Sequence, residues 1–154
     1  MPERLLLDRL LLIADVLQRD MARAFAGTEL SGARMAVLWV VHHSGPATQQ
    51  ALATELDVTP RNISALVDAL ETAGFVRRAP HPADRRAHLV ELTGAGVELM
   101  TRTAREHAEL SARLLDAVAG DDRTALERGL DAIAVRLAQL IAEADESADD
   151  AASR

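Results

Sequence analysis

Two arginine-bearing segments of the sequence carry the side chains best suited to binding a nucleic acid. Arg61 and Asn62 stand in the first turn of an expected helix, directly after Thr59 and Pro60. Arginine and asparagine form paired hydrogen bonds with the edges of guanine and adenine. The second segment is the loop 79–87, APHPADRRA, in which an arginine follows an aspartate by two positions. These residue types predict contact with a duplex from both segments.

Recurrent apolar residues place the arginine and asparagine on the outer face of a helix. Thr59 can cap this helix, because its hydroxyl satisfies a backbone N–H that has no partner within the helix, and Pro60 has no N–H to lose in the first turn. The buried face is expected at residues with three- and four-residue spacing, which are Ile63, Leu66, Val67 and Leu70. The opposite face has short side chains such as Ala65. Such a face fits a DNA major groove.

The residues on either side predict a helix-turn-helix followed by a hairpin. Residues 47–56 predict a short helix, and residues 57–58 supply a tight turn into the next one. Two helices joined in this way form a helix-turn-helix motif. Gly74 is expected to end the second helix, and residues 75–78 and 88–92 are expected to pair as strands.

Four stretches follow one another in an order typical of a known protein family. They are Leu30-Ser31 before a helix through Val37-Leu38-Trp39, the phrase Leu70-x-x-x-Gly74-Phe75-Val76-x-Arg78, the pair Asp84-x-Arg86, and Leu92-Thr93 before a long helix. Together with the helix-turn-helix, they resemble the multiple antibiotic resistance regulator (MarR) family of winged-helix transcription factors. The resemblance covers nearly the whole chain. It implies a mostly α-helical fold, in which a winged helix-turn-helix with a small β-hairpin wing joins an all-helical dimerisation base.

The resemblance also implies one domain over residues 1–154, with three regions. Residues 31–92 form the winged helix-turn-helix lobe that binds DNA. Residues 3–26 and 93–144 form the helical dimerisation region. Residues 145–154, which are rich in aspartate and glutamate, are expected to be a flexible acidic tail.

Surplus apolar surface points to the same dimer. The run 5–17, LLLDRLLLIADVL, is too apolar for a helix with one solvated face, yet its charged residues argue against a membrane span of about 20 mainly apolar residues. A helix of this kind needs a partner. Two further helices are expected from Thr93 to about Ala119 and from Asp121, a plausible cap, to Ala144. An ordinary core within one chain is the alternative.

The resemblance assigns roles to the residues of the wing. In the family the wing-tip arginine enters the minor groove and the aspartate braces it, which implies these roles for Arg86 and Asp84. Residues two apart in a hairpin loop can project to one side, so the Asp84 carboxylate is expected to bind the Arg86 guanidinium. A surface ion pair without function is the alternative. Arg77 and Arg78 are phosphate contacts or fold-stabilising partners. The expected DNA contacts are Thr59, Pro60, Arg61, Asn62, Ser64, Ala65, Arg77, Arg78, Asp84, Arg85 and Arg86.

The net charge of −7 is unevenly distributed along the chain. Residues 75–88 carry four arginines against one aspartate, whereas residues 143–154 carry five acidic residues against one arginine. Because a Debye length of about 8 Å screens distant charges, the local patch decides phosphate binding. All 17 basic residues are arginine, which suits bidentate contacts but is explained as well by a GC-rich coding sequence.

Several kinds of chemistry are excluded. The sequence has no cysteine, so thiol sensing, disulfides and thiolate metal sites are absent. His42 and His43 diverge by about 100° on a helix and cannot both face one ion. His81 and His88 are expected to approach phosphates rather than a metal. Enzyme and dinucleotide motifs are missing, and residues 93–96 predict only a flexible first turn of a helix. We therefore expect no enzyme, no metal and no cofactor.

The sequence thus predicts a cytoplasmic, homodimeric regulator that binds a pseudo-palindromic operator in double-stranded DNA. A repressor released by a small apolar or aromatic effector fits best. The resemblance implies an effector pocket lined by Met21, Phe25, Met35, Leu38, Trp39 and His42, unless these residues are simply core. A winged helix that docks proteins without binding DNA is the alternative. Guanidinium groups on both the helix and the wing favour DNA.

Overall fold

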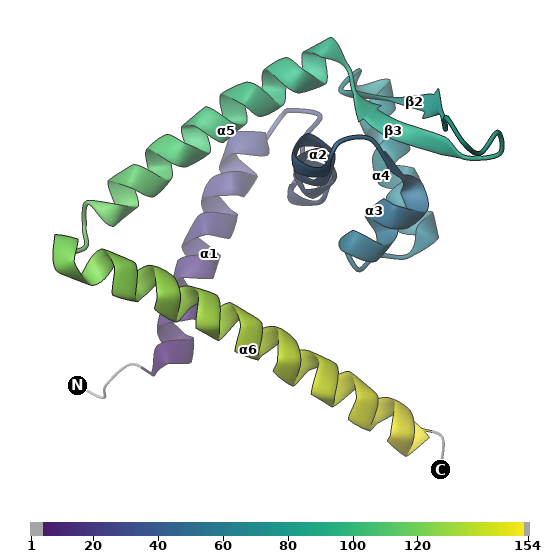
Figure 1. Ribbon diagram of the computed structural model, residues 1–154. Coiled ribbons are helices and arrows are strands. Elements are labelled where there is room, and N and C mark those ends of the chain that lie inside the picture. Colours follow the sequence, from purple (N-terminus) through teal and green to yellow (C-terminus); the bar gives the residue numbers. More distant parts are fainter. Residues whose placement is uncertain (1–4, 153–154) are drawn as a thin grey trace. The chain divides into compact units, whose positions relative to one another are not determined.

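The computed structural model describes residues 5–152, with side chains for residues 5–145. The described chain is mostly helical and includes a small antiparallel sheet, which confirms the predicted winged helix-turn-helix (Figure 1). Its elements are α1 (Leu6–Phe25), α2 (Gly32–Ser44), β1 (Ala47–Thr48), α3 (Gln49–Glu55), α4 (Pro60–Thr72), β2 (Val76–Pro80), β3 (His88–Leu92), α5 (Gly94–Leu115) and α6 (Gly120–Ala152). The chain divides into two compact units, residues 1–104 and 105–154.

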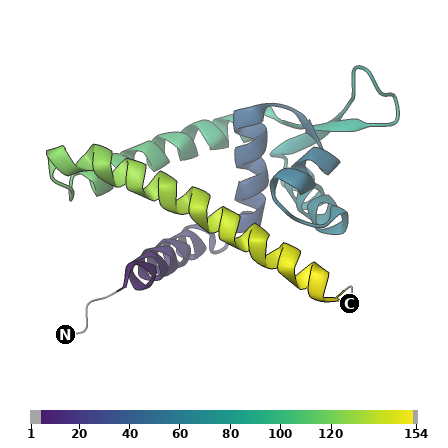
Figure 2. The same cartoon turned by 60° about the horizontal axis from the view of Figure 1, so that its bottom comes forward.

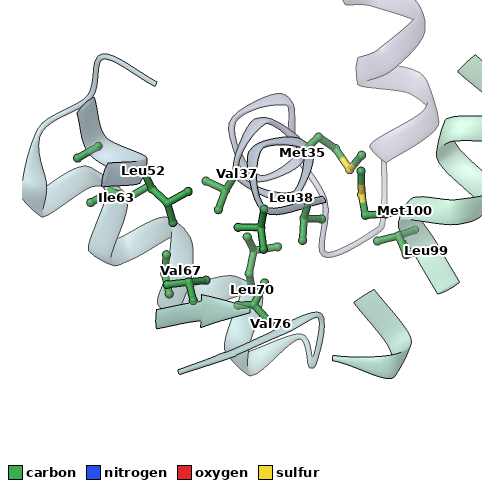
Figure 3. Close-up of a cluster of buried hydrophobic side chains, with 13 residues drawn as sticks. Met35, Val37, Leu38, Leu52, Ile63, Val67, Leu70, Val76, Leu99 and Met100 are labelled. Carbon is green, nitrogen blue, oxygen red and sulfur yellow. The ribbon is translucent and has the colours of Figure 1, made fainter. Parts of the chain in front are cut away.

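The first unit has an aliphatic core that joins the helix-turn-helix to the wing. Leu38 of α2, Leu52 of α3, Leu70 of α4, Val90 of β3 and Met100 of α5 are all fully buried. Figure 3 shows side chains from α2, α3, α4, β2 and α5 converging on this cluster. Each large side chain contributes about 1.5 to 3 kcal/mol when fully buried. The core fixes α4 and the wing within one unit.

Helix α4 begins and ends as its sequence predicts. The hydroxyl of Thr59 accepts a hydrogen bond from the N–H of Asn62 at 3.2 Å, and Pro60 occupies the first turn. At the other end Gly74 adopts a φ of 81°, which places it in the left-handed region that favours glycine. The N–H of Phe75 then reaches back to the carbonyl of Leu70 at 3.0 Å and closes the helix.

The sheet is larger than predicted and has the strand order β1-β3-β2. Ala47 and Thr48, predicted to be helical, instead form strand β1 and pair with Val90 and Leu89. Helix α3 starts at Gln49, two residues later than predicted, because the Thr48 hydroxyl caps it by accepting from the N–H of Ala51 at 3.1 Å. Strand β1 therefore joins the helix-turn-helix to the wing through backbone pairing.

The hairpin strands also differ slightly from their predicted limits. Strand β2 starts at Val76 rather than Phe75 and continues to Pro80, which pairs with His88. The loop between the strands is therefore shorter than the predicted 79–87. We call residues 81–87 the wing tip.

The junction between the wing and α5, predicted as a flexible first turn, is held by hydrogen bonds of Thr93 and a close approach at Gly96. The hydroxyl of Thr93 donates to the carbonyl of Gly74 at 2.6 Å and accepts from the N–H of Gly96 at 3.1 Å. A Cβ atom on Gly96 would lie 2.0 Å from the carbonyl oxygen of Phe75. Gly96 is therefore required for the close approach of α5 to the chain before β2.

The C-terminal helices differ from prediction at their ends. Helix α5 stops at Leu115 rather than about Ala119, and α6 already includes Gly120, so Asp121 lies in its first turn instead of capping it. Helix α6 does not stop at about Ala144 but continues to Ala152 as one long helix (Figure 2). Residues 142–152 contain no glycine or proline and several alanines, a composition that favours helix over the flexible tail predicted. Residues 153–154 of that tail lie outside the described residues.

Helix α1 has no buried residue, and Phe25 at its end packs against the core while remaining partly exposed. Its leucines face outward, and Leu7 and Leu11 are 60% and 59% exposed. Among the described residues no helix is long and apolar enough to cross a membrane.

Candidate nucleic-acid interface

The outer face of α4 carries the predicted base-reading side chains. Arg61, Asn62 and Ala65 are exposed, as are Thr59 and Pro60 at the start of the helix. Ser64 is half-buried, and the opposite face contributes Ile63, Val67 and Leu70 to the core. The polar first turn of α4 is thus open to a ligand while its apolar face is fixed.

The wing tip is organised differently from its prediction. The Asp84 carboxylate does not bind the Arg86 guanidinium but accepts a hydrogen bond from the Arg86 backbone N–H at 2.9 Å. An aspartate that bonds to the backbone two residues later is a common turn-forming arrangement, and no ion pair joins Asp84 to Arg86. The predicted ion pair is therefore wrong. Asp84 fixes the backbone of Arg86, whose guanidinium has no ion-pair partner in the part of the chain that the structure describes.

Of the five arginines on α4 and in the wing, three have guanidinium groups without a carboxylate partner among the described residues. They belong to Arg61 on α4 and to Arg85 and Arg86 at the wing tip, and all three residues are exposed. An exposed arginine without an ion pair keeps its donors available for phosphate oxygens or base edges.

Arg77 is paired within the wing. Its Nε donates to Oε1 of Glu91 at 2.6 Å, from strand β2 to the directly opposite residue of β3. Opposite charges at such facing positions stabilise a hairpin modestly.

Arg78 ties the wing to both helices of the helix-turn-helix. Its guanidinium donates to Asp68 Oδ1 at 2.5 Å, to a carboxylate oxygen of Glu71, and to Oε1 of Gln49 on α3 at 3.0 Å. Burial alone would lower the pKa of Arg78, but the hydrogen bonds and charges of Asp68 and Glu71 outweigh this and raise it above its ordinary value. The guanidinium therefore stays charged, and its position indicates the fold-stabilising role of the two predicted alternatives.

Charge counting along the sequence overstated the positive charge of the wing. Two of its four arginines are paired with carboxylates from β3 and α4. The unpaired positive charge is concentrated at Arg85 and Arg86. Asp84 is exposed, and its carboxylate accepts a hydrogen bond from the loop backbone. The candidate surface consists of this wing tip and the first turn of α4, both in the first unit (Figure 1).

His81 makes contacts within the wing tip that the sequence did not predict. Its Nδ1 accepts the backbone N–H groups of Ala83 and Asp84 at 3.2 and 3.1 Å, and an approach of the ring to phosphate stays a prediction. The signal that could have revealed this is the proline at position 82, which lacks an N–H and leaves the next two donors to a preceding side chain.

Comparison with known proteins agrees with this architecture. A model of the MarR family matches residues 30–88. An uncharacterized HTH-type transcriptional regulator of Mycobacterium bovis is 30% identical over 115 residues, which is 75% of this chain and 80% of the relative. A relative from Thauera aromatica is 33% identical over 107 residues, which is 66% of this chain but only 64% of its own length. The chain belongs to the MarR family of transcriptional regulators.

Solved structures share the fold. The transcriptional repressor CouR, solved bound to a 23-mer DNA duplex, is 30% identical, with a TM-score of 0.69 over 84% of this chain and 92% of that chain. FabT of Streptococcus pneumoniae, solved in complex with DNA, is 21% identical, with a TM-score of 0.78 over 86% of this chain and 95% of that chain. Membership in a family of regulators fits a sequence without an enzyme motif.

Of the six residues implied as an effector pocket for a MarR family protein, only two line the pocket between α1 and α2. Met35 and Leu38 are buried in the core. Met21 and Phe25 instead line a mainly apolar pocket of about 410 Å³ where α1 leads into α2. Trp39 and His42 lie outside this pocket, with their ring centroids 5.9 Å apart.

The two histidines of α2 contact Trp39 of the same helix. His43 Nδ1 lies 2.9 Å from the carbonyl oxygen of Trp39, and its ring is tilted against the indole at a centroid distance of 5.1 Å. Within residues 5–145 no group of three or more histidine, aspartate or glutamate side chains could hold a metal ion.

Proposed function

We propose that the protein binds a specific site in double-stranded DNA as a homodimer, and that it represses transcription until a small molecule releases it. The observation that carries the DNA-binding part is the placement of unpaired arginines on two different elements, Arg61 on α4 and Arg85 and Arg86 at the wing tip. A recognition helix in the major groove and a wing along the neighbouring backbone or groove would use both. Binding by CouR supports the proposal.

The residues proposed to contact DNA fall into two groups. Arg61 and Asn62 read base edges, and Thr59, Pro60, Ser64 and Ala65 form the surface around them. Arg85 and Arg86 bind the phosphates and the minor groove, where negative potential attracts arginine. Asp84, Arg77 and Arg78 hold the wing in place through their hydrogen bonds. Of these three, only the two arginines add attraction for phosphate, and it is independent of sequence.

Docking of another protein is the alternative use of this surface. A docking face is typically apolar at its centre, and its charged groups lie at the rim. The exposed first turn of α4 and the wing tip offer arginine, asparagine and short side chains instead. This chemistry favours DNA.

Uncovered apolar helices support the homodimer. Helix α1 has no buried residue, and residues 120–145 of α6 have none either. Val135 and Ile141 of α6 are 59% and 55% exposed. Apolar helix faces of this size are unfavourable in water, and a second copy would cover them. Two copies also present two recognition helices to an inverted repeat.

The pocket beside Met21 and Phe25 is the best place for the proposed effector. Its lining is mainly aliphatic and aromatic, with Gln18 and Ser31 as polar groups, so it suits a small apolar or aromatic molecule. The pocket adjoins α1, which we place in the dimer base. A ligand there could alter how two DNA-binding lobes are spaced. We place the whole protein in the cytoplasm, where it has access to its operator.

Selection from random DNA duplexes, combined with sedimentation of the free protein and the complex, tests the proposal. We expect a pseudo-palindromic site with half-site centres about 10 to 10.5 base pairs apart, bound by one dimer. Selected sequences without inverted symmetry would argue against the recognition geometry. A protein that stays monomeric at micromolar concentration would argue against the dimer.

A further inference from the structure

The wing tip is closed by side-chain acceptors as well as by its backbone. The N–H of His81 donates to the carbonyl of Ala87 at 3.1 Å, where the two strands end. Inside the loop the N–H groups of Ala83 and Asp84 both point to Nδ1 of the His81 ring, at 3.2 and 3.1 Å. Pro82, between them and the histidine, has no N–H to offer. One imidazole therefore satisfies both backbone donors that follow the proline.

These partners determine the tautomer of the His81 ring. Backbone N–H groups can only donate, so Nδ1 must present its lone pair and carry no proton. In the neutral ring the proton then lies on Nε2. A proton on Nδ1 would face the N–H groups of Ala83 and Asp84, and both hydrogen bonds would be lost.

The arginines of the wing depend on this loop through Asp84. His81 holds the N–H of Asp84. Asp84 in turn accepts from the N–H of Arg86 through its carboxylate at 2.9 Å and from the N–H of Ala87 through its carbonyl at 3.1 Å. Hydrogen bonds thus run from the imidazole to the backbone that carries Arg86. A loop fixed before binding loses less conformational entropy when it meets DNA.

We infer that neutral His81 is a positioning residue for DNA binding: its Nδ1 atom holds the wing tip in the conformation that presents Arg85 and Arg86, and protonation of the ring releases the loop. This role rests on the DNA binding proposed above. Histidine side chains change charge between about pH 5 and 8. Binding that uses the wing therefore weakens as the pH falls through this range.

The surroundings of His81 include charged groups from each neighbouring strand and from the loop. The pocket that His81 lines, of about 450 Å³, is also lined by Arg78 of β2, Asp84 of the loop and His88 of β3. The guanidinium of Arg78 is positive and the carboxylate of Asp84 is negative, so charges of both signs lie near the ring. The remaining lining residues, from β1, α3 and the loop, are uncharged: Thr48, Gln49, Gln50 and Ala87. His88 is the other histidine that lines this pocket, so His88→Gln provides a background in which His81 is the only histidine there.

Two substitutions at position 81 separate the acceptor from the ring. His81→Asn keeps an oxygen acceptor near the place of Nδ1 and cannot take up a proton, whereas His81→Leu has no acceptor. At about pH 7.5 we expect His81→Asn to bind the selected operator within about threefold of the wild type, and His81→Leu to bind on the order of tenfold more weakly. At about pH 5.5 we expect the wild type to lose affinity relative to His81→Asn, also in the His88→Gln background.

The opposite results would overturn the inference. His81→Leu binding as tightly as the wild type at about pH 7.5 would show that the acceptor is dispensable. An affinity ratio of wild type to His81→Asn that stays constant or rises as the pH falls would show that protonation does not release the loop. A rise is the result expected if the added charge simply attracts phosphate.

Measurements on the free protein test His81 without DNA. Nitrogen chemical shifts should show an unprotonated Nδ1 near neutral pH, and the amide hydrogens of Ala83 and Asp84 should exchange more slowly in the wild type and His81→Asn than in His81→Leu. A protonated Nδ1, or equal exchange in all three proteins, would refute the inference. A wild type that binds no duplex would refute the proposed function instead, and the exchange data would still decide the role of His81.

Discussion

The carboxylate of Asp84 accepts a hydrogen bond from the backbone N–H of Arg86 at 2.9 Å. The aspartate therefore fixes the backbone position of Arg86 and does not hold its guanidinium. Because the guanidinium has no carboxylate partner among the described residues, binding DNA need not break an ion pair. Removing the Arg86 side chain should consequently affect DNA binding far more than folding.

For Arg86→Ala we expect nearly unchanged thermal unfolding and a loss of about 1 to 3 kcal/mol in DNA-binding free energy. The dependence of log K on log salt should become shallower by about one phosphate contact, and the preference for A·T pairs beside the half-sites should weaken. Exposed Arg102 of α5 gives a control, Arg102→Ala, that removes an equal charge elsewhere. An Arg86→Ala protein with wild-type affinity at physiological salt would refute the wing assignment and favour protein docking.

Asparagine and alanine at position 84 test how the aspartate acts. Asp84→Asn keeps the oxygen that accepts the Arg86 N–H and removes a negative charge near phosphate, so its DNA affinity should equal or exceed that of the wild type. Asp84→Ala loses the acceptor and should bind more weakly, though less so than Arg86→Ala. Affinities that are equally weak for both variants would show that the charge matters, which is what a guanidinium brace would require.

Local sequence predicted α4 well, because each of its signals acts over a few residues. The Thr59 cap, the apolar spacing and the positive φ of Gly74 are all determined within the helix and its ends. The ion pairs of Arg77 and Arg78 could not be predicted in this way. Their partners Glu91, Asp68 and Glu71 lie seven to fourteen residues away and become neighbours only when the strands pair and the hairpin folds against α4.

Close contacts between elements also could not be predicted from the sequence. Gly96 appears locally as a flexible residue, and only the approach of the Phe75 carbonyl shows why a side chain is excluded there. Ala47 and Thr48 directly precede helix α3, and they form a strand because their backbone pairs with β3. The hydrogen bonds of His81 were not predicted either, although their backbone donors lie in its own loop.

The ion pairs of Arg77 and Arg78 predict that replacing each by alanine lowers the free energy of unfolding by a different amount. The Arg78 side chain is 25% exposed and is bonded to α3 and α4. Arg78→Ala should therefore lower the free energy of unfolding by about 1 to 2 kcal/mol. The Arg77 side chain is 69% exposed and has one ion-pair partner, so Arg77→Ala should lower the free energy of unfolding by less than about 1 kcal/mol. Denaturant unfolding of both variants measures the difference. Equal losses would show that the links from Arg78 to the helices contribute nothing.

Two glycines of α5 provide a matched pair for the junction between wing and helix. Gly96→Ala should destabilise the protein by about 3 kcal/mol or more, because its Cβ would lie 2.0 Å from the Phe75 carbonyl oxygen, and backbone must move to make room. Gly94→Ala places the same methyl group in open space and should leave the unfolding free energy within about 1 kcal/mol of the wild type. Similar thermal unfolding of the two variants would contradict the close approach.

Arg61 is the residue on which base reading should depend. It lies exposed in the first turn of α4, where a recognition helix meets base edges, and it has no carboxylate partner among the described residues. Arg61→Ala should cost about 1 to 3 kcal/mol on the selected operator and relax the preference at particular base pairs. Arg77→Ala is the control, because any effect of this paired arginine should weaken all duplexes alike. Repeating the selection with each variant separates the two roles. If Arg61→Ala selected the same sequences as the wild type, Arg61 would be a phosphate contact, and specificity would have to come from Asn62 or from the shape of the DNA.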